Sequence, residues 1–271
     1  MKLPAVLQAL ALGPVRLACA VWALLAFLCV GVTLLLLLVG LPGVMRRRTA
    51  ARAAARTLLR LAGMRLTVRF PERLPPGQCV VVCNHASYLD GIVLTAALPA
   101  RFGFVIKREM AAVPLAGALL RRLGSEFVER FDRQRSARDA RRVLRNAIQG
   151  HSLVFFPEGT FTRTPGLLKF HTGAFATAIR AGCPLVPAVL RGTRRALPPH
   201  RSLPRPGAIE LEILPLLTAA AGTPDQAAAD LRDRARQAIL TALAEPDLTC
   251  CGDTDRPPDT TPARSARASR P

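Results

Sequence analysis

Residues 80–90 read VVVCNHASYLD, and this stretch decides the fold class. The four apolar residues from Val80 to Cys83 favour a strand that is buried on both faces, and the polar residues after them mark its end. Residues 89–98 then show the spacing of apolar positions that is typical of a helix. A buried strand that leads through a short turn into a helix is the unit from which α/β domains are built.

Outward from this stretch, strands and helices alternate along the chain. Strand character is found at 65–70, 78–83, 102–107, 152–156, 185–190 and 209–214, and helical character at 89–98, 114–123, 132–149, 172–181 and 224–243. The alternation predicts an α/β domain over residues 46–245, with a mixed, mostly parallel sheet flanked by helices. Residues 246–271 are rich in Pro, Asp, Thr, Ser and Arg without periodicity, which predicts a disordered tail.

The composition limits the classes of function. Half of the residues are hydrophobic, which is enough for a packed core, and the net charge of +20 suits either nucleic acid or an anionic membrane. One Trp and one Tyr provide few stacking side chains, so we expect no nucleic-acid partner. Seven Cys without a CxxC pair, together with four His, argue against a disulfide scaffold and a metal site.

The N-terminal residues carry the most apolar run. No charged residue lies between Arg16 and Arg46, and residues 17–40 are mostly Leu, Val and Ala. Because this run exceeds the roughly 20 residues that span a bilayer, it predicts a membrane helix and a membrane anchor over residues 1–45. A membrane hairpin or an interfacial insertion is the alternative.

Arginines follow this run directly. By the positive-inside rule they place the rest of the chain on the cytoplasmic side of the inner membrane. Arginine also recurs at every fourth position, at Arg48, Arg52, Arg56 and Arg60, which predicts a basic amphipathic helix. We expect this arginine stripe to rest on anionic membrane phospholipids, with an ordinary solvated helix face as the alternative.

Polar side chains with catalytic potential follow the strand at residues 80–83. His85 and Asp90 are five residues apart and would lie about 140° apart on a continuous helix. A turn between them would let Asp90 orient His85 as a general base. The pair alone is also compatible with a capping or packed histidine. Cys83 is a rival nucleophile, but its position in an apolar run favours a packed thiol.

Three further blocks accompany this one. They are Gly124-Ser125-Glu126-Phe127-Val128-Glu129-Arg130, Phe155-Phe156-Pro157-Glu158-Gly159-Thr160 and Val186-Pro187-Ala188-Val189. With Asn84-His85-Ala86-Ser87-Tyr88-Leu89-Asp90 they follow the order N-H-x4-D, G-x-x-F-I-x-R, F-P-E-G-T and V-P-x. Over roughly residues 60–217 the chain therefore resembles the glycerolipid acyltransferases, specifically the 1-acylglycerol-3-phosphate acyltransferase family.

The resemblance implies a membrane-bound enzyme that uses no cofactor beyond its acyl donor. An acyl group would move from acyl-CoA or acyl carrier protein to the free hydroxyl of a lysophospholipid. With 1-acylglycerol-3-phosphate as the acceptor, the product would be phosphatidic acid. His85 would be the general base and Asp90 would fix its orientation. Two alternatives are an acyltransferase for another lysolipid, such as lysophosphatidylethanolamine or an aminoacyl lysolipid, and a non-catalytic lipid-binding protein of the same fold.

The resemblance also implies where the acceptor binds. Lys107 and Arg130 would bind its phosphate, and Glu158 would hydrogen-bond a glycerol hydroxyl. The backbone amides of Gly159 and Thr160 would face the phosphate.

One residue departs from the family pattern. Many members have Arg directly after E-G-T, where this chain has Phe161, and the next basic residue is Arg163. Residues 161 and 163 would lie on the same face of an extended segment. We therefore expect Arg163 to reach the acceptor phosphate, with a surface arginine beside a Phe161 that packs on an acyl chain as the alternative.

Overall fold

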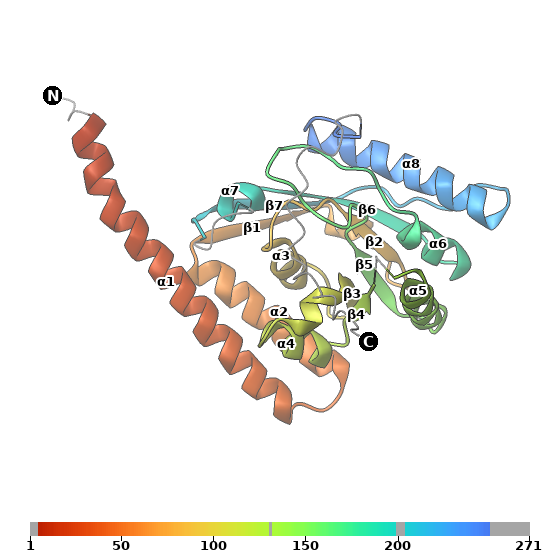
Figure 1. The fold of residues 1–271 in the computed structure, drawn as a ribbon, viewed down its shortest axis with the longest axis horizontal. Helices are drawn as coiled ribbons and strands as arrows, with labels where there is room; N and C mark the ends of the chain where they lie inside the picture. Colours follow the sequence, from red (N-terminus) through yellow and green to blue (C-terminus); the bar gives the residue numbers. More distant parts are fainter. Residues whose placement is uncertain (1–4, 130–131, 199–203, 250–271) are drawn as a thin grey trace, which may run out of the picture.

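The structure is a computed structural model that describes residues 5–129, 132–198 and 204–249. A seven-stranded sheet in the order β1-β7-β6-β2-β5-β3-β4 forms its centre (Figure 1). Its strands are β1 Met64–Arg69, β2 Val80–Cys83, β3 Phe102–Lys107, β4 Glu126–Val128, β5 Ser152–Phe155, β6 Leu185–Arg191 and β7 Gly207–Ile213. All neighbouring pairs are parallel except β6 and β7, which confirms the predicted mixed, mostly parallel sheet.

Helices cover both faces of the sheet (Figure 1). They are α1 Ala5–Gly40, α2 Val44–Leu61, α3 Asp90–Ala97, α4 Ala116–Arg122, α5 Arg133–Ile148, α6 Gly173–Arg180, α7 Thr193–Ala196 and α8 Pro224–Leu243, with short 3₁₀ turns η1 Pro71–Arg73 and η2 Arg108–Ala112. One core contains Val81 and Cys83 of β2 with α2 and α3, and the other contains Val80 and Val82 with α6 and α8. Because both faces of β2 are buried, its sequence is uniformly apolar.

The elements follow the sequence prediction closely, with two small additions. Each predicted strand and helix of the α/β domain is present, and most boundaries agree within two residues. The short strand β4 and the four-residue helix α7 were not predicted, because three or four residues are too few for a periodic pattern.

The N-terminal helix packs beside α2 and against α4 (Figure 1). Leu34 and Leu38 of α1 are buried with Ala51 of α2, and Leu119 and Leu123 pack against them. Among the helices of the described residues, none combines the length and the apolar character that crossing a bilayer requires. The structure therefore does not support the membrane-spanning helix predicted at residues 17–40.

Arginines of the α2 stripe bind backbone carbonyl groups of the protein. Arg48 donates hydrogen bonds to the carbonyl oxygens of Leu123 and Gly124, at 2.9 and 3.1 Å, where α4 ends. Arg56 donates to Ala96 at 2.9 Å, where α3 ends. Unpaired carbonyl groups at helix C-termini attract cations, which explains these contacts. Contact of the arginine stripe with phospholipid headgroups stays a prediction.

The chain after α8 folds back onto the domain. The amide of Leu167 donates to Pro246, and that of Leu248 donates to Leu167, at 2.9 and 3.0 Å. Gly166, at φ 143°, passes so close to Leu248 that a β-carbon would overlap it. Residues 246–249, predicted to belong to a disordered tail, thus form what we name the C-terminal strap, whereas residues 250–271 lie outside the described residues.

Candidate active site

His85 and Asp90 meet at the carboxyl end of β2. The strand ends at Cys83 and α3 begins at Asp90, so the intervening loop is the turn that the sequence spacing requires. His85 Nδ1 lies 2.7 Å from Asp90 Oδ2, and the backbone amides of Ala86 and Ser87 donate to the same oxygen at 2.6 and 2.9 Å. The structure therefore brings the predicted pair together in hydrogen-bonding geometry.

The environment of the pair fixes its proton arrangement. The Asp90 side chain is 1% exposed and that of His85 is 18% exposed. An ionised carboxylate only accepts hydrogen bonds, so the ring nitrogen Nδ1 of His85 is the donor and Nε2 carries the lone pair. Such an imidazole can take a proton through Nε2, and Asp90 then stabilises the positive charge.

Asn84, which was not predicted as a site residue, links the loop that carries His85 to strand β6. The Asn84 side chain donates to the Leu190 carbonyl at 3.0 Å and accepts from the Leu190 amide at 2.7 Å. Asn84 is 3% exposed, so these bonds satisfy an amide that burial would otherwise destabilise. Its place beside His85 in the N-H-x4-D block was the one signal that marked it.

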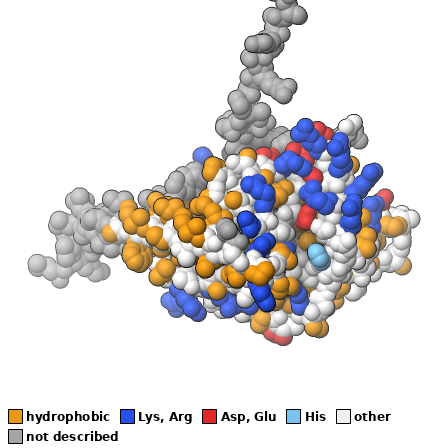
Figure 2. Space-filling model, turned by 90° about the horizontal axis from the view of Figure 1, so that it is seen from below, with side chains coloured by type: hydrophobic (Ala, Val, Ile, Leu, Met, Phe, Trp, Pro, Cys, Tyr) orange, Lys and Arg blue, Asp and Glu red, His pale blue; other side chains and the backbone are white. Residues whose placement is uncertain are grey.

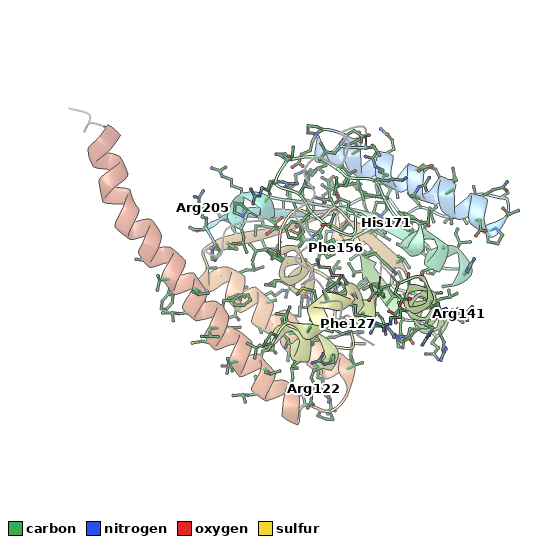
Figure 3. The ribbon with its side chains drawn as sticks, in the orientation of Figure 1. Arg122, Phe127, Arg141, Phe156, His171 and Arg205 are labelled. Atoms are coloured by element: carbon green, nitrogen blue, oxygen red, sulfur yellow. The ribbon has the colours of Figure 1, made fainter. Side chains whose placement is uncertain are left out.

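Aromatic rings surround the His85 imidazole. Phe156 stacks on it at 4.2 Å between centroids, and Phe161 meets it edge-on at 4.5 Å. Tyr88 in turn meets Phe161 at 4.9 Å. Figure 3 shows Phe156 near the middle of the molecule in this view, close to the sheet. Phe161 thus packs against the imidazole at the position where many family members have Arg.

Glu158 is turned toward the protein backbone. Its Oε1 accepts from the His85 amide at 2.6 Å and its Oε2 accepts from the Leu168 amide at 2.9 Å. The residue is 4% exposed. Desolvation raises the pKa of Glu158 to about 7, and nearby Asp90 acts in the same direction, whereas the two amides and Arg194 oppose the shift.

Four of the other residues predicted to bind the acceptor lie at one cavity, and the fifth lies outside the described residues. Lys107, Gly159, Thr160 and Arg163 line one cavity together with His85. The Gly159 amide donates to the Phe156 carbonyl at 3.0 Å and closes a turn at φ 74°, and its contact with a phosphate stays a prediction. The predicted contact of Arg130 lies outside the described residues.

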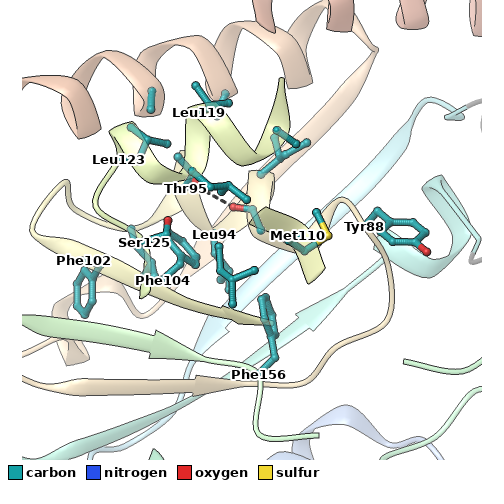
Figure 4. A pocket seen from close by; sticks show the side chains of 18 of the residues that line it. Tyr88, Leu94, Thr95, Phe102, Phe104, Met110, Leu119, Leu123, Ser125 and Phe156 are labelled. Atoms are coloured by element: carbon teal, nitrogen blue, oxygen red, sulfur yellow. Dashed lines mark hydrogen bonds between the residues drawn. The ribbon is translucent and has the colours of Figure 1, made fainter. Parts of the chain in front are cut away.

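The cavity extends from His85 into the space between the sheet and the N-terminal helices. Its volume is about 800 Å³ and its walls come from α1, α2, α3, β3 and α4. Figure 4 shows Phe102, Phe104, Leu94 and Leu119 among the side chains that line it, with Tyr88 at a distance from Phe102. Most of the side chains that line the cavity are apolar, so the cavity suits a hydrocarbon chain.

Two other chemistries have no support from this arrangement. Cys83 is completely buried, and its burial, reinforced by Asp90 and Glu158, raises the pKa of its thiol well above the ordinary value. A neutral buried thiol is a poor nucleophile. Within the described ranges, no three His, Cys, Asp or Glu side chains form a group that could hold a metal ion.

Comparison with known proteins identifies the family. The acyltransferase family model matches residues 65–191, which contain His85, Asp90 and Glu158. The 1-acyl-sn-glycerol-3-phosphate acyltransferase alpha of Homo sapiens is 33% identical over 191 residues, which cover 68% of this chain and 66% of the human protein. The chain belongs to the 1-acylglycerol-3-phosphate acyltransferase family. The resemblance found in the four sequence blocks is thereby confirmed.

Other members of the family agree. A 1-acyl-sn-glycerol-3-phosphate acyltransferase of Chlamydomonas reinhardtii is 31% identical over 182 residues, covering 66% of this chain and 53% of that protein. The chain thus spans between about half and two thirds of these curated relatives. The crystal structure of the 1-acyl-sn-glycerophosphate acyltransferase from Thermotoga maritima matches the fold with a TM-score of 0.70 at 19% identity, covering 84% of this chain and 95% of that one.

Proposed function

We propose that this protein moves a fatty acyl group from acyl-CoA or acyl carrier protein to the free hydroxyl of a lysophospholipid. The acceptor in this proposal is 1-acylglycerol-3-phosphate and the product is phosphatidic acid, as the names of the curated relatives suggest. The observation that carries the proposal is the position of the His85–Asp90 pair beside a mostly apolar cavity of about 800 Å³. A proton acceptor beside space for an acyl chain is what this transfer needs.

The chemistry follows from the geometry of the pair. His85 Nε2 takes the proton of the acceptor hydroxyl while the oxygen forms a bond to the thioester carbonyl carbon. The carbon–sulfur bond then breaks, and the protonated imidazole returns the proton to the leaving thiolate. Asp90 holds the ring through Nδ1 at 2.7 Å and stabilises its charge in both steps.

The acceptor phosphate needs cations near His85. Lys107 and Arg163 line the cavity, and Arg130 occupies the basic position of its family block. A phosphate monoester is stabilised by more than one such partner. The packing of Phe161 on His85 supports a second candidate acceptor, a lysolipid with a less charged phosphate diester such as lysophosphatidylethanolamine.

Incubation of the purified protein with labelled donors tests the proposal. Acyl-CoA and acyl carrier protein would each be offered with a panel of lysolipids, and His85→Ala would serve as the control. We expect phosphatidic acid as the main labelled product with the wild-type protein and none with the variant. Absence of transfer to every lysolipid would reject the enzymatic function, and preferred labelling of a diester lysolipid would replace the acceptor.

We also propose that the protein works at the cytoplasmic face of the inner membrane. Several large apolar side chains of α1 are exposed, including Trp22, Leu25 and Leu36 at 57%, 52% and 68%. Figure 2 shows hydrophobic side chains gathered on one side of the molecule. An exposed apolar patch of this kind is typical of a surface that contacts lipid or another protein. The cytoplasmic side is the one predicted from the arginines after residue 45.

A further inference from the structure

The carboxylate of Glu158 links two loops that are far apart in the sequence. One oxygen accepts from the amide of His85 at the end of β2, and the other accepts from Leu168 in the segment after β5. Glu158 is almost completely buried, and it is absent from the lining of the cavity although its neighbour Gly159 is part of it. The carboxylate therefore contacts the backbone that carries His85 and lies behind the surface available to a substrate.

The three consecutive amides of the His85 loop are all bound by carboxylates. Glu158 binds the amide of His85, and Asp90 binds those of Ala86 and Ser87. Asp90 also binds the imidazole, so its position depends on the same loop. The carboxyl groups of Asp90 and Glu158 accept all three amide hydrogen bonds, so together they hold the loop in one conformation. Displacement of the His85 backbone would move Nε2 away from the acceptor hydroxyl.

We infer that Glu158 is a positioning residue that fixes the backbone of His85, and that it acts on the acceptor through His85 instead of binding a glycerol hydroxyl. This inference rests on the proposed acyl transfer. It assigns Glu158 a different task from the one that the sequence resemblance implied.

The chemistry of the carboxylate explains why a close replacement does not serve. In Glu158→Gln, one of the two side-chain atoms becomes an NH₂ group, which cannot accept from the amide that it faces. In Glu158→Asp, the side chain is shorter by one methylene and cannot reach both His85 and Leu168. Each variant therefore loses at least one of the two backbone bonds while the cavity walls stay unchanged.

Hydrolysis of the thioester without an acceptor distinguishes positioning of His85 by Glu158 from binding of the acceptor by Glu158. Water can replace the lysolipid, so hydrolysis of acyl-CoA depends on His85 but not on acceptor binding. For Glu158→Gln we expect hydrolysis and transfer to fall together by roughly tenfold or more in kcat, with the acceptor KM within about twofold of the wild type. Normal hydrolysis together with a raised acceptor KM would overturn the inference and restore Glu158 as an acceptor ligand.

Glu245→Gln is the matched control. Glu245 Oε2 accepts from the Gly166 amide at 2.7 Å, so this variant loosens the same segment that Leu168 belongs to without touching the His85 loop. We expect its hydrolysis and transfer rates to stay near those of the wild type. An equal loss in both variants would overturn the inference, because the effect would then arise from the segment at residues 166–168.

Hydrogen exchange gives a readout that requires no activity. The His85 amide should be protected in the wild-type protein and should exchange faster in Glu158→Gln. If the variant fails to fold, protection of this amide in the wild type still tests the bond, and rapid exchange there would overturn the inference. A protein that transfers no acyl group but protects the His85 amide would reject the proposed function alone.

Discussion

The imidazole of His85 is held on several sides. Asp90 binds Nδ1, Phe156 stacks on one face and Phe161 meets the ring edge-on. The His85 side chain is only 18% exposed, and a setting with little solvent strengthens its hydrogen bond to Asp90. A histidine in such a setting has one orientation and one proton arrangement, as a general base requires.

Removal of the imidazole should therefore stop the reaction. We expect His85→Ala to reduce turnover on the order of a thousandfold, because a positioned general base contributes about 10²–10⁴ in rate. Asp90→Asn should also lose a large part of the rate, since it misorients the ring. Transfer of labelled acyl groups measures both, and circular dichroism checks folding. A well-folded His85→Ala protein with normal turnover would contradict the role of His85.

Glu158 makes stability depend on pH. Its pKa rises from 4.5 to about 7 on folding, so between these values the folded protein holds a proton that the unfolded chain has lost. The stability from this group is present below pH 4.5 and is lost as pH rises through about 7. As pH rises from about 4.5 to about 8, we expect the free energy of unfolding of the wild type to fall by about 3 kcal/mol relative to that of Glu158→Gln, whose side chain does not titrate.

Urea unfolding of the two proteins across this pH range measures the difference. Other titrating groups are common to both chains and cancel in the comparison. A constant difference between wild type and Glu158→Gln would show that the carboxyl group ionises in the folded protein at its ordinary pKa.

Arg163 remains the predicted partner of the acceptor phosphate. It lines the cavity beside Thr160 and Phe161. We expect Arg163→Ala to raise the acceptor KM by roughly tenfold, which is about 1.4 kcal/mol of binding, with little change for the acyl donor. Steady-state kinetics measure this, and Lys169→Ala, an exposed residue outside the cavity lining, is the control. An unchanged KM for every accepted lysolipid would favour the reading of Arg163 as a surface residue.

At the scale of the elements, sequence periodicity predicted most of the helices and strands, because they depend on the local pattern of apolar residues. The buried strand β2, the helix α3 and the turn between them could be predicted because apolar runs and polar strand ends are local signals. The partners of Glu158 and Asn84 could not, since Leu168 and Leu190 come from segments that only the folded sheet brings near. The carbonyl contacts of Arg48 and Arg56 could not be predicted for the same reason, because a helical repeat does not reveal what each side chain contacts.

Arg48 should contribute to stability through these contacts. It is partly buried and donates to the carbonyl oxygens of Arg101, Leu123 and Gly124. Burial lowers the pKa of this guanidinium, although Glu126 opposes the shift. We expect Arg48→Ala to lower the free energy of unfolding by about 2 kcal/mol, because three carbonyl groups lose a charged donor. Thermal unfolding measures this, and the exposed Arg60→Ala is the control. Equal stability of both variants would contradict the prediction.

At the scale of the whole molecule, two features favour contact with an anionic membrane: the apolar surface of α1 and the excess of basic residues. The net charge is +20, and exposed apolar residues lie along α1. Cations attract anionic lipid over about a Debye length, and apolar side chains then contact the hydrocarbon boundary. The sequence predicted contact with a membrane, but it did not reveal that the inner face of α1 packs on α2 and α4.

Trp22, the one tryptophan of the chain, is a natural reporter of this contact. Its side chain is 57% exposed, and its indole nitrogen donates to the Leu61 carbonyl at 3.1 Å. We expect its fluorescence to shift to the blue when vesicles with anionic phospholipids are added, because the indole leaves water. Neutral vesicles and added salt should weaken the shift. An emission spectrum that anionic vesicles leave unchanged would contradict membrane contact at Trp22.

The order of the strands also affects how the chain is made. β1 is the first strand to be synthesised, yet it lies at the edge of the sheet, where its neighbour is β7, the last strand. At a synthesis rate of about 5–20 residues per second, β1 waits on the order of ten seconds for its partner to leave the ribosome. During that time α1 and α2 have already emerged and their apolar faces lack the domain that covers them. Completion of this domain is therefore a late event in translation, and the nascent chain needs protection until then.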